Sequence, residues 1–291
     1  SLGRSAEAAV VLGQAYGRGL RSLRLLHVMT TLPPGFVPID ILGALDHLAV
    51  ERNADDAAFR NTFLFVKAAA LDAAGRHAEA WETLVAANRP LATEYQAELE
   101  AHIAAREASL ARLRSVGRPV QAFASHQHPI SLFILGASRS GKTTLERLVS
   151  SLEPVKAGCE VPIVEKAVRR SLNAAAIPPS RRLEDLPAEL SSLFRETYLE
   201  DLVQRAGSAR IVTNTLPGHV YNAALLASLI PNARFLLVKR SPEDVIWRIF
   251  LTKYLRGNPY AYDLRAIRDY LDWYNLMIDL TAERLPGVTR S

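Results

Sequence analysis

A glycine-rich loop between a short apolar run and an amphipathic segment constrains this sequence more than any other feature. Residues 132–135 form the apolar run, and residues 136–143, GASRSGKT, match the pattern G-x-x-x-x-G-K-[S/T] at every position. Residues 145–151 then read as a helix. Glycines allow the loop to turn successive backbone N–H groups inward, and a helix N-terminus adds partial positive charge. The pattern therefore predicts a site for phosphate or sulfate at the carboxyl end of a buried strand.

The rest of the chain divides into a helical part and an alternating part. Apolar residues recur at three and four spacing over 5–29 and 40–114, and segments 55–74 and 76–88 meet at Gly75 as an αα-hairpin, with a long helix expected over 91–114. Apolar runs at 210–213 and 234–238 alternate with amphipathic helices. We therefore expect an all-α helical-repeat region over 1–118, a linker over 119–129 and an α/β domain over 130–291. The α/β domain should be a P-loop-type parallel sheet flanked by helices.

Composition and charge restrict the class of ligand and the kind of protein. Residues 1–125 hold 13 basic and 13 acidic side chains, whereas residues 126–291 hold 22 and 17, so the net charge of +5 lies in the second part. This modest excess favours a small anion over nucleic acid. The single cysteine, Cys159, forms no intramolecular disulfide, and no apolar run approaches the roughly 18 residues of a membrane helix. We expect a cytoplasmic protein without a membrane span, and no metal site at His126 and His128.

The residues at the ends of the expected strands indicate whether the phosphate chemistry uses a metal ion. A nucleotide triphosphatase or kinase places an acidic residue after another strand to hold magnesium. The expected strands end at Thr213-Asn214 and at Lys239-Arg240, and neither is acidic. Chemistry without a metal is therefore favoured, and an ATP-using kinase or nucleotide triphosphatase remains the alternative.

Three segments together resemble one enzyme family. Residues 129–143, PISLFILGASRSGKT, resemble the 5′-phosphosulfate loop of sulfotransferases that use 3′-phosphoadenosine 5′-phosphosulfate (PAPS). Residues 230–235, IPNARF, and 239–244, KRSPED, resemble the family's 3′-phosphate strand and following helix. Residues 257–264, GNPYAYDL, and the hairpin at Gly75 are similar to a bacterial branch in which a tetratricopeptide repeat precedes the catalytic domain.

The resemblance implies roles for individual residues. The expected donor-binding residues are Ser138, Arg139, Ser140, Gly141, Lys142, Thr143, Thr144, Arg240 and Arg248. Arg139 and Lys142 would neutralise charge that develops on the donor, and Glu160 would accept the proton of the acceptor hydroxyl. A helix N-terminal acid is the other interpretation of Glu160, and His219 is a lesser candidate base.

Three other residues also have a simpler, structural interpretation. A salt bridge is the alternative role for Arg240, and an ion pair with Asp244 is the alternative for Arg248. Cys159 is expected to be a small buried residue rather than a nucleophile.

The sequence departs from the family pattern at three positions. Lys142 replaces the first threonine of the loop motif, Thr215 replaces a Lys or His, and Arg248 replaces a serine. The chain ends at Ser291, before the family's next strand, so we expect a domain truncated at its C-terminus.

The expected function is PAPS-dependent sulfuryl transfer, without a metal, to a hydroxyl of a protein, sugar or small molecule. The third possibility is a non-catalytic nucleotide-binding protein whose helical repeat recruits a protein partner.

Overall fold

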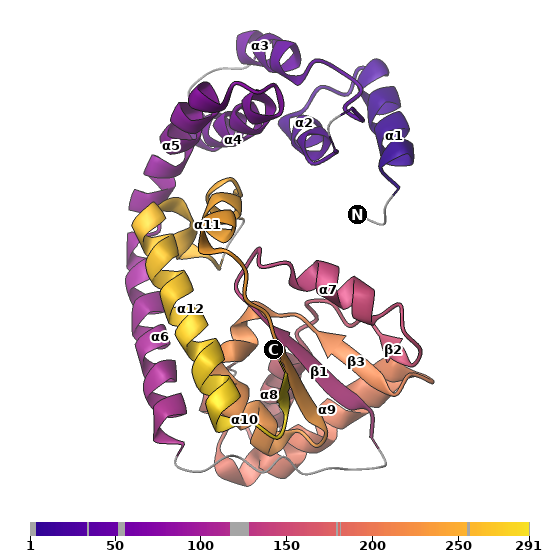
Figure 1. Ribbon diagram of the computed structural model, residues 1–291, viewed down its shortest axis with the longest axis vertical. Helices are drawn as coiled ribbons and strands as arrows, with labels where there is room; N and C mark the ends of the chain where they lie inside the picture. Colours follow the sequence, from indigo (N-terminus) through magenta and orange to yellow (C-terminus); the bar gives the residue numbers. More distant parts are fainter. Residues whose placement is uncertain are drawn as a thin grey trace. The chain divides into compact units, whose positions relative to one another are not determined.

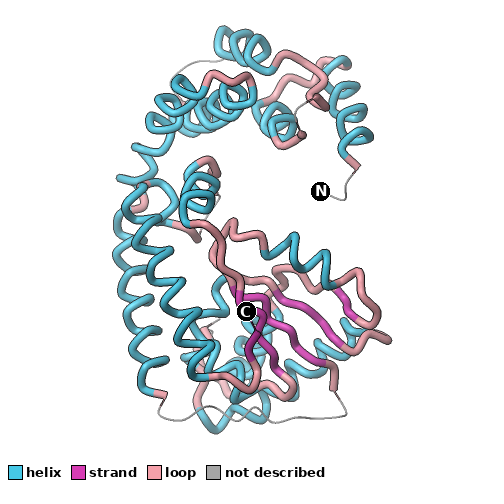
Figure 2. The backbone as a smooth tube through the Cα atoms, in the orientation of Figure 1, coloured by secondary structure: helices cyan, strands magenta, loops and turns pink. Residues whose placement is uncertain are grey.

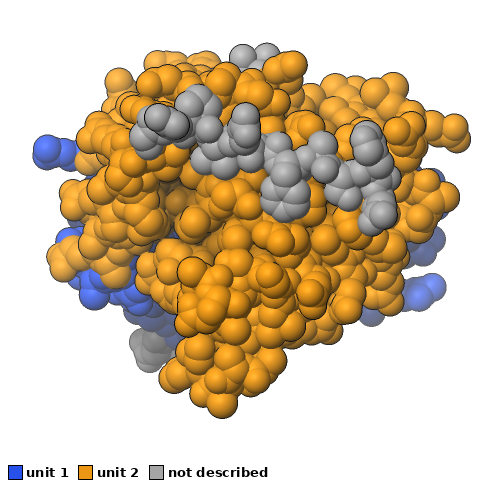
Figure 3. All heavy atoms as spheres, turned by 90° about the horizontal axis from the view of Figure 1, so that it is seen from below, with its two compact units in different colours: residues 1–99, 246–267 blue, residues 100–245, 268–291 orange. Residues whose placement is uncertain are grey.

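The structure of the protein is a computed structural model, which describes residues 4–33, 35–51, 56–116, 128–178, 180, 182–254 and 257–290. The chain divides into two compact units, coloured separately in Figure 3. Unit 1 comprises residues 1–99 and 246–267, and unit 2 comprises residues 100–245 and 268–291. The boundaries expected at 118, 119–129 and 130 stay a prediction, and most of that linker, residues 119–127, lies outside the described residues.

Unit 1 is helical, as the apolar spacing predicts (Figures 1 and 2). Its helices are α1 Ser5–Gly17, α2 Leu23–Thr30, α3 Ile41–Glu51, α4 Ala57–Ala73 and α5 His77–Glu94. The turn between α4 and α5 contains Gly75 in the left-handed conformation, with φ +75°, which a side chain would disfavour. The amide of Asn61 crosses from α4 to the carbonyl oxygen of Ala87 at 2.6 Å. The expected hairpin is confirmed, and its kinship with tetratricopeptide repeats stays a prediction.

The helix expected over 76–88 is longer than its pattern indicates. α5 continues through Pro90 to Glu94, and α6 spans Gln96–Ser115, so the break falls at Tyr95 rather than before residue 91. Proline usually ends or kinks a helix because it lacks an N–H group. Here Leu84, Ala87 and Leu91 are buried on one face on both sides of Pro90, and their packing continues the helix.

Unit 2 contains a five-stranded, entirely parallel sheet in the order β2-β3-β1-β4-β5. The strands are β1 Ile130–Leu135, β2 Val155–Lys156, β3 Ile211–Asn214, β4 Ala233–Leu237 and β5 Thr289–Arg290. The three strands that the apolar runs predict are confirmed. β2 and β5 were not expected, because two residues carry no apolar pattern. The central strand, β1, is the one that leads into the glycine-rich loop.

Helices flank the sheet, with α7 on one side and α8 and α9 on the other (Figure 1). The remaining α-helices are α7 Lys142–Val149, α8 Ile163–Ala174, α9 Ser191–Ala206, α10 Ala223–Leu229, α11 Pro242–Phe250 and α12 Leu264–Arg284. Short 3₁₀ helices are η1 Leu183–Asp185, η2 Ala188–Leu190, η3 Pro217–Asn222 and η4 Pro259–Tyr262. Among the described helices, none combines the length and apolarity needed to cross a membrane.

The core of unit 2 fixes the sheet that carries the loop. Phe133 of β1 and Phe235 of β4 stack with ring centroids 5.4 Å apart. Tyr198 of α9 is fully buried and donates its hydroxyl to Ser131 Oγ at 2.9 Å. Because all the strands are parallel, the residues that follow β1, β3 and β4 meet at one edge of the sheet, which is where open α/β sheets bind ligands.

Candidate functional site

The glycine-rich loop runs from Gly136 to Gly141 between β1 and α7. Arg139 and Gly141 adopt positive φ angles of 64° and 99°, which fold the loop back above the helix N-terminus. A side chain at Gly136 would lie 2.5 Å from Ser140 Oγ and 3.1 Å from Val238 Cβ, so any larger residue would displace the Ser140 hydroxyl where the loop leaves the strand. The hydroxyl of Ser140 is buried and has no hydrogen-bond partner. An unpartnered donor inside such a loop suits an anionic oxygen.

Lys142 is the buried cation of this loop. Its side chain is 5% exposed, and its Nζ donates to the carbonyl oxygen of Ala137 at 2.9 Å. Burial lowers the pKa of Lys142 to about 8, the charge of Glu160 opposes this shift, and the charge of Arg139 adds to it. The structure therefore brings Arg139, Lys142 and Glu160 within electrostatic reach of one another. Ser138 is half-buried, whereas Thr143 and Thr144 are exposed in the first turn of α7.

The segment that carries Glu160 is hydrogen-bonded to α7, the helix that follows the loop, and to β3. Glu146, on α7, is 2% exposed, and its Oε1 accepts from the Cys159 backbone N–H at 2.9 Å and from the hydroxyl of Thr213. The Gly158 N–H donates to Thr213 Oγ1 at 3.0 Å, and the Thr215 N–H donates to the Cys159 carbonyl at 3.2 Å. These bonds hold the exposed Glu160 next to the phosphate loop.

Gly158 allows this segment to form its hydrogen bonds with β3. A side chain on Gly158 would lie 2.0 Å from the carbonyl oxygen of Thr213, so only glycine allows the segment to approach β3. Cys159 follows with φ 54° and is exposed, and the expectation that it is buried is wrong. Its backbone N–H donates to Glu146 and its carbonyl oxygen accepts from the Thr215 N–H, while its side chain lies at the surface.

The two arginines expected at the 3′-phosphate differ in surroundings. Arg240 follows β4 and pairs with Asp244 of α11 at 3.3 Å, so the salt bridge considered for it is present. Arg248 is exposed on α11 and groups with unit 1. Among the described residues, Asp244 pairs with Arg240 and no ion pair joins it to Arg248. A phosphate contact for either arginine stays a prediction.

His219 lies apart from this set of contacts. It is 4% exposed in η3, and its ring packs edge-on against Phe133 with centroids 5.1 Å apart. Glu165 Oε1 lies 3.6 Å from its Nε2. Thr215, at the position where the family has Lys or His, is buried at the end of β3. The proposed role of His219 as a base stays a prediction.

The amino-acid pattern did not reveal Glu146 and Thr213, which hold the segment with Glu160 in place. Glu146 reads as an ordinary acid on an amphipathic helix, and Thr213 reads as a strand residue. The one available signal was the spacing of Glu146, four residues after Lys142, which places both on the same face of α7. Among the described residues, no group of three or more His, Cys, Asp and Glu side chains could hold a metal ion.

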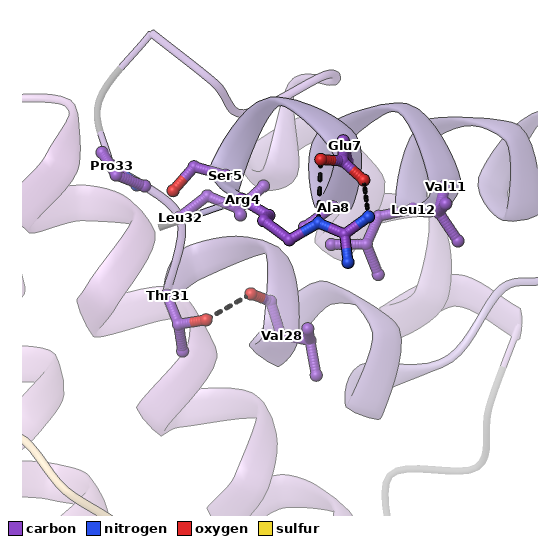
Figure 4. Close-up of a pocket in the computed structure, with 10 residues that line it drawn as sticks. All are labelled: Arg4, Ser5, Glu7, Ala8, Val11, Leu12, Val28, Thr31, Leu32 and Pro33. Carbon is purple, nitrogen blue, oxygen red and sulfur yellow. Dashed lines mark hydrogen bonds and ion pairs between the residues drawn. The ribbon is translucent and has the colours of Figure 1, made fainter. Parts of the chain in front are cut away.

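A cavity of about 530 Å³ lies in unit 1 between α1 and α2 (Figure 4). An ion pair between Arg4 and Glu7 borders it, and Val11 and Val28 present apolar surface to it. Its lining residues do not form a catalytic constellation. Its apolar character is compatible with a protein partner, which stays a prediction.

The fold is a parallel α/β domain with a glycine-rich loop after its central strand, and comparison with known sequences specifies the family. Residues 129–287 match the Sulfotransferase family, which is more than half of the 291 residues. The chain belongs to this family of enzymes.

Curated relatives are similar to the chain at low identity. The chain is 24% identical over 161 residues to protein-tyrosine sulfotransferase 1 of Rattus norvegicus, covering 54% of the chain and 43% of that protein. It is 24% identical over 164 residues to protein-tyrosine sulfotransferase 2 of Gallus gallus, covering 55% and 43%. An uncharacterized protein of Aquifex aeolicus is 23% identical over 222 residues, covering 72% and 29%. The chain thus spans less than half the length of these relatives.

Proposed function

We propose that this chain transfers a sulfuryl group from PAPS to a hydroxyl acceptor. The observation that supports this most directly is that Arg139 lies on the glycine-rich loop, Lys142 at its end, and Glu160 close enough for its charge to act on Lys142. Two cations and an unpartnered Ser140 hydroxyl suit the 5′-phosphosulfate, and a carboxylate beside them suits proton removal. Neither β3 nor β4 ends in an acidic residue that could hold magnesium, which disfavours the kinase alternative.

In the proposed mechanism the acceptor oxygen attacks the sulfur in line with the bridging oxygen of the donor. A new S–O bond forms, the S–O bond to the phosphate breaks, and 3′-phosphoadenosine 5′-phosphate leaves with the negative charge. Glu160 takes the proton of the acceptor hydroxyl. Arg139 and Lys142 stabilise the charge that grows on the bridging oxygen, and the loop N–H groups bind the 5′-phosphate.

The nucleotide is the first test. We expect 3′-phosphoadenosine 5′-phosphate to bind without magnesium and at least tenfold more tightly than ATP, because the proposed site has cations for two separated phosphates. Isothermal titration calorimetry measures both affinities. Magnesium-dependent binding of ATP, with none of the bisphosphate, would instead support a kinase or nucleotide triphosphatase.

Replacement of Arg240 tests the 3′-phosphate assignment. Arg240→Ala should weaken 3′-phosphoadenosine 5′-phosphate by about 10- to 150-fold, the range of a charge-assisted contact of ~1.5–3 kcal/mol. Adenosine 5′-phosphosulfate, which has no 3′-phosphate, should bind almost as before. Equal weakening of both ligands would show that the Arg240–Asp244 ion pair is structural. The same pair of titrations on Arg248→Ser tests the second arginine.

The pKa of Lys142 predicts how donor affinity varies with pH. Burial lowers this pKa to about 8 in the free protein, and a bound phosphate raises it again by favouring the charged form. The complex therefore holds more protons than the free protein above pH 8, and bisphosphate affinity should fall as pH rises, by up to about tenfold per pH unit. Titration calorimetry from pH 7 to 10 measures this. Lys142→Met should remove the dependence, and persistence of the slope in that variant would assign it to another group.

A further inference from the structure

Glu160 lies in an irregular segment whose position depends on side chains from elsewhere in the fold. Residues 157–162 connect β2 with α8 and form neither a helix nor a strand. Such a segment lacks a regular pattern of hydrogen bonds of its own, so its backbone groups need other partners. Partners for four of these groups come from α7 and from the end of β3.

Glu146 and Thr213 bind the two residues directly before Glu160. The Gly158 N–H donates to Thr213 Oγ1 at 3.0 Å, and the Cys159 N–H donates to Glu146 Oε1 at 2.9 Å. The Thr213 hydroxyl donates in turn to the same oxygen of Glu146. Because a threonine hydroxyl has one proton, this bond turns the oxygen lone pairs of Thr213 toward the Gly158 amide. The two side chains therefore act together as the acceptors for both amides.

The residue after Glu160 is bound to the same end of β3. The Asn214 amide donates to the Val161 carbonyl oxygen at 3.0 Å. The Thr215 N–H donates to the carbonyl oxygen of Cys159 at 3.2 Å. Glu160 therefore has a hydrogen-bonded residue on each side, and these bonds restrict how far its backbone can move from the phosphate loop.

Neither Glu146 nor Thr213 is accessible to a substrate. The exposed fractions are 2% for Glu146 and 1% for Thr213, whereas Glu160 is exposed. Burial of a carboxylate is unfavourable unless hydrogen bonds compensate for the lost water. An apolar residue at position 146 would avoid that cost, but it would leave the Cys159 amide without this acceptor. The acid is therefore better explained by what it holds than by packing.

We propose that Glu146 and Thr213 are positioning residues for Glu160, which set the rate of sulfuryl transfer without contacting donor or acceptor. The inference rests on the proposed function and deepens it by two residues that assist proton removal. A base acts only where its oxygen reaches the acceptor proton, and a displacement of about 1 Å can lower a rate by about 10²-fold. The pair contributes hydrogen-bond acceptors at fixed places rather than negative charge.

Paired substitutions test whether the acceptor atoms matter. Thr213→Val and Glu146→Met keep the approximate size of each side chain and remove its acceptor. Each should lower the single-turnover rate by about 10- to 100-fold and change bisphosphate affinity less than about threefold. Thr213→Ser and Glu146→Gln keep an acceptor oxygen and should retain at least about a third of the rate. Thr281→Val, which removes another buried hydroxyl from α12, is the matched control.

The rate is measured on the full chain with labelled PAPS. The probes are 2-naphthol, N-acetylglucosamine and a peptide that contains tyrosine, and the probe that the unaltered chain sulfates fastest is used for every variant. Combining Thr213→Val with Glu160→Gln then distinguishes positioning from a general defect. Thr213→Val should slow the Glu160→Gln chain by less than about twofold, because the group that Thr213 positions is already absent.

The pKa of Lys142 provides a readout that needs no acceptor. Burial lowers this pKa, and the charge of Glu160 opposes the shift. Moving the Glu160 carboxylate away should therefore lower the pKa further. Carbon-13 NMR of labelled lysine, assigned with Lys142→Met, should find a lower pKa in Thr213→Val than in the unaltered chain or in Thr281→Val. Adding Glu160→Gln to Thr213→Val should lower it no more.

Several outcomes would overturn the inference. They are an unchanged rate and Lys142 pKa in Thr213→Val, a full multiplication of losses in the double variant, and a rate in Glu146→Gln as low as in Glu146→Met. Loss of bisphosphate affinity in Thr213→Val would make its role structural. If no probe is sulfated, the pKa of Lys142 decides. Failure of the bisphosphate to bind the unaltered chain would refute the donor proposal, and normal transfer by Glu160→Gln would refute the base and this inference together.

Discussion

Glu160→Gln is expected to lower turnover by about 10²–10⁴-fold and to leave the affinity for 3′-phosphoadenosine 5′-phosphate unchanged. The substitution keeps the size of the side chain and removes its capacity to take a proton. Glu160 is exposed at the loop and acts on Lys142 through its charge, so it can reach an acceptor that enters from solvent. Turnover is measured as release of the bisphosphate from PAPS with a panel of phenols, sugars and peptides.

A control separates the loss of a base from the loss of a surface charge. Glu196→Gln removes an exposed carboxylate from α9 and should leave turnover unchanged. If Glu160→Gln turns over normally, the carboxylate is not the base, and the same assay on His219→Phe would then test the other candidate. An unaltered chain that binds the bisphosphate and transfers to no acceptor would favour the non-catalytic nucleotide-binding protein.

Lys142→Met is expected to lower turnover by about 10²–10³-fold and to weaken the bisphosphate. A fixed donor aimed at developing charge contributes this much in other enzymes, and methionine keeps the length of the buried side chain without its charge. The unaltered lysine is held by the Ala137 carbonyl at 2.9 Å, within the loop it would serve. Single-turnover kinetics with labelled PAPS separate the chemical step from donor binding.

Two further variants define what the lysine does. Lys156→Met removes an exposed cation from β2 and should change neither quantity. Lys142→Thr restores the residue that the family has in this loop, and it should retain donor binding because a threonine hydroxyl can donate to the 5′-phosphate. Unchanged turnover in Lys142→Met would contradict the proposed role and leave Arg139 as the cation at the bridging oxygen.

The local sequence predicts the phosphate loop and its immediate supports. The apolar run before Gly136, the second glycine at Gly141 and the helix after Lys142 are separated by a few residues, and their signals do not depend on distant partners. The parallel sheet follows from the same kind of pattern, because β1, β3 and β4 are largely buried and read as apolar runs. The hairpin at Gly75 is also local. The likeness to sulfotransferases rests on these same short segments, so it is visible in the amino-acid sequence alone.

Tertiary contacts alone determine how the segment with Glu160 is held. Glu146 binds Cys159 across 13 positions and Thr213 across 67, and neither separation leaves a trace in local spacing. The exposure of Cys159 follows from those bonds rather than from its residue type. β2 and β5, two residues each, are strands only because β3 and β4 provide a paired edge.

Contacts between distant segments also explain why residues 246–267 belong to the helical unit 1. Trp81 stacks on Trp247 with centroids 6.1 Å apart, the Asn88 amide donates to the Phe250 carbonyl at 3.2 Å, and Lys253 donates to Thr62 at 2.7 Å. Each contact joins α4 or α5 to residues more than 150 positions later in the chain. Periodicity identified the helices and the loop because their hydrogen bonds and burial repeat within a few residues. Contacts between distant segments depend on where the completed fold places them, and only the tertiary structure could determine them.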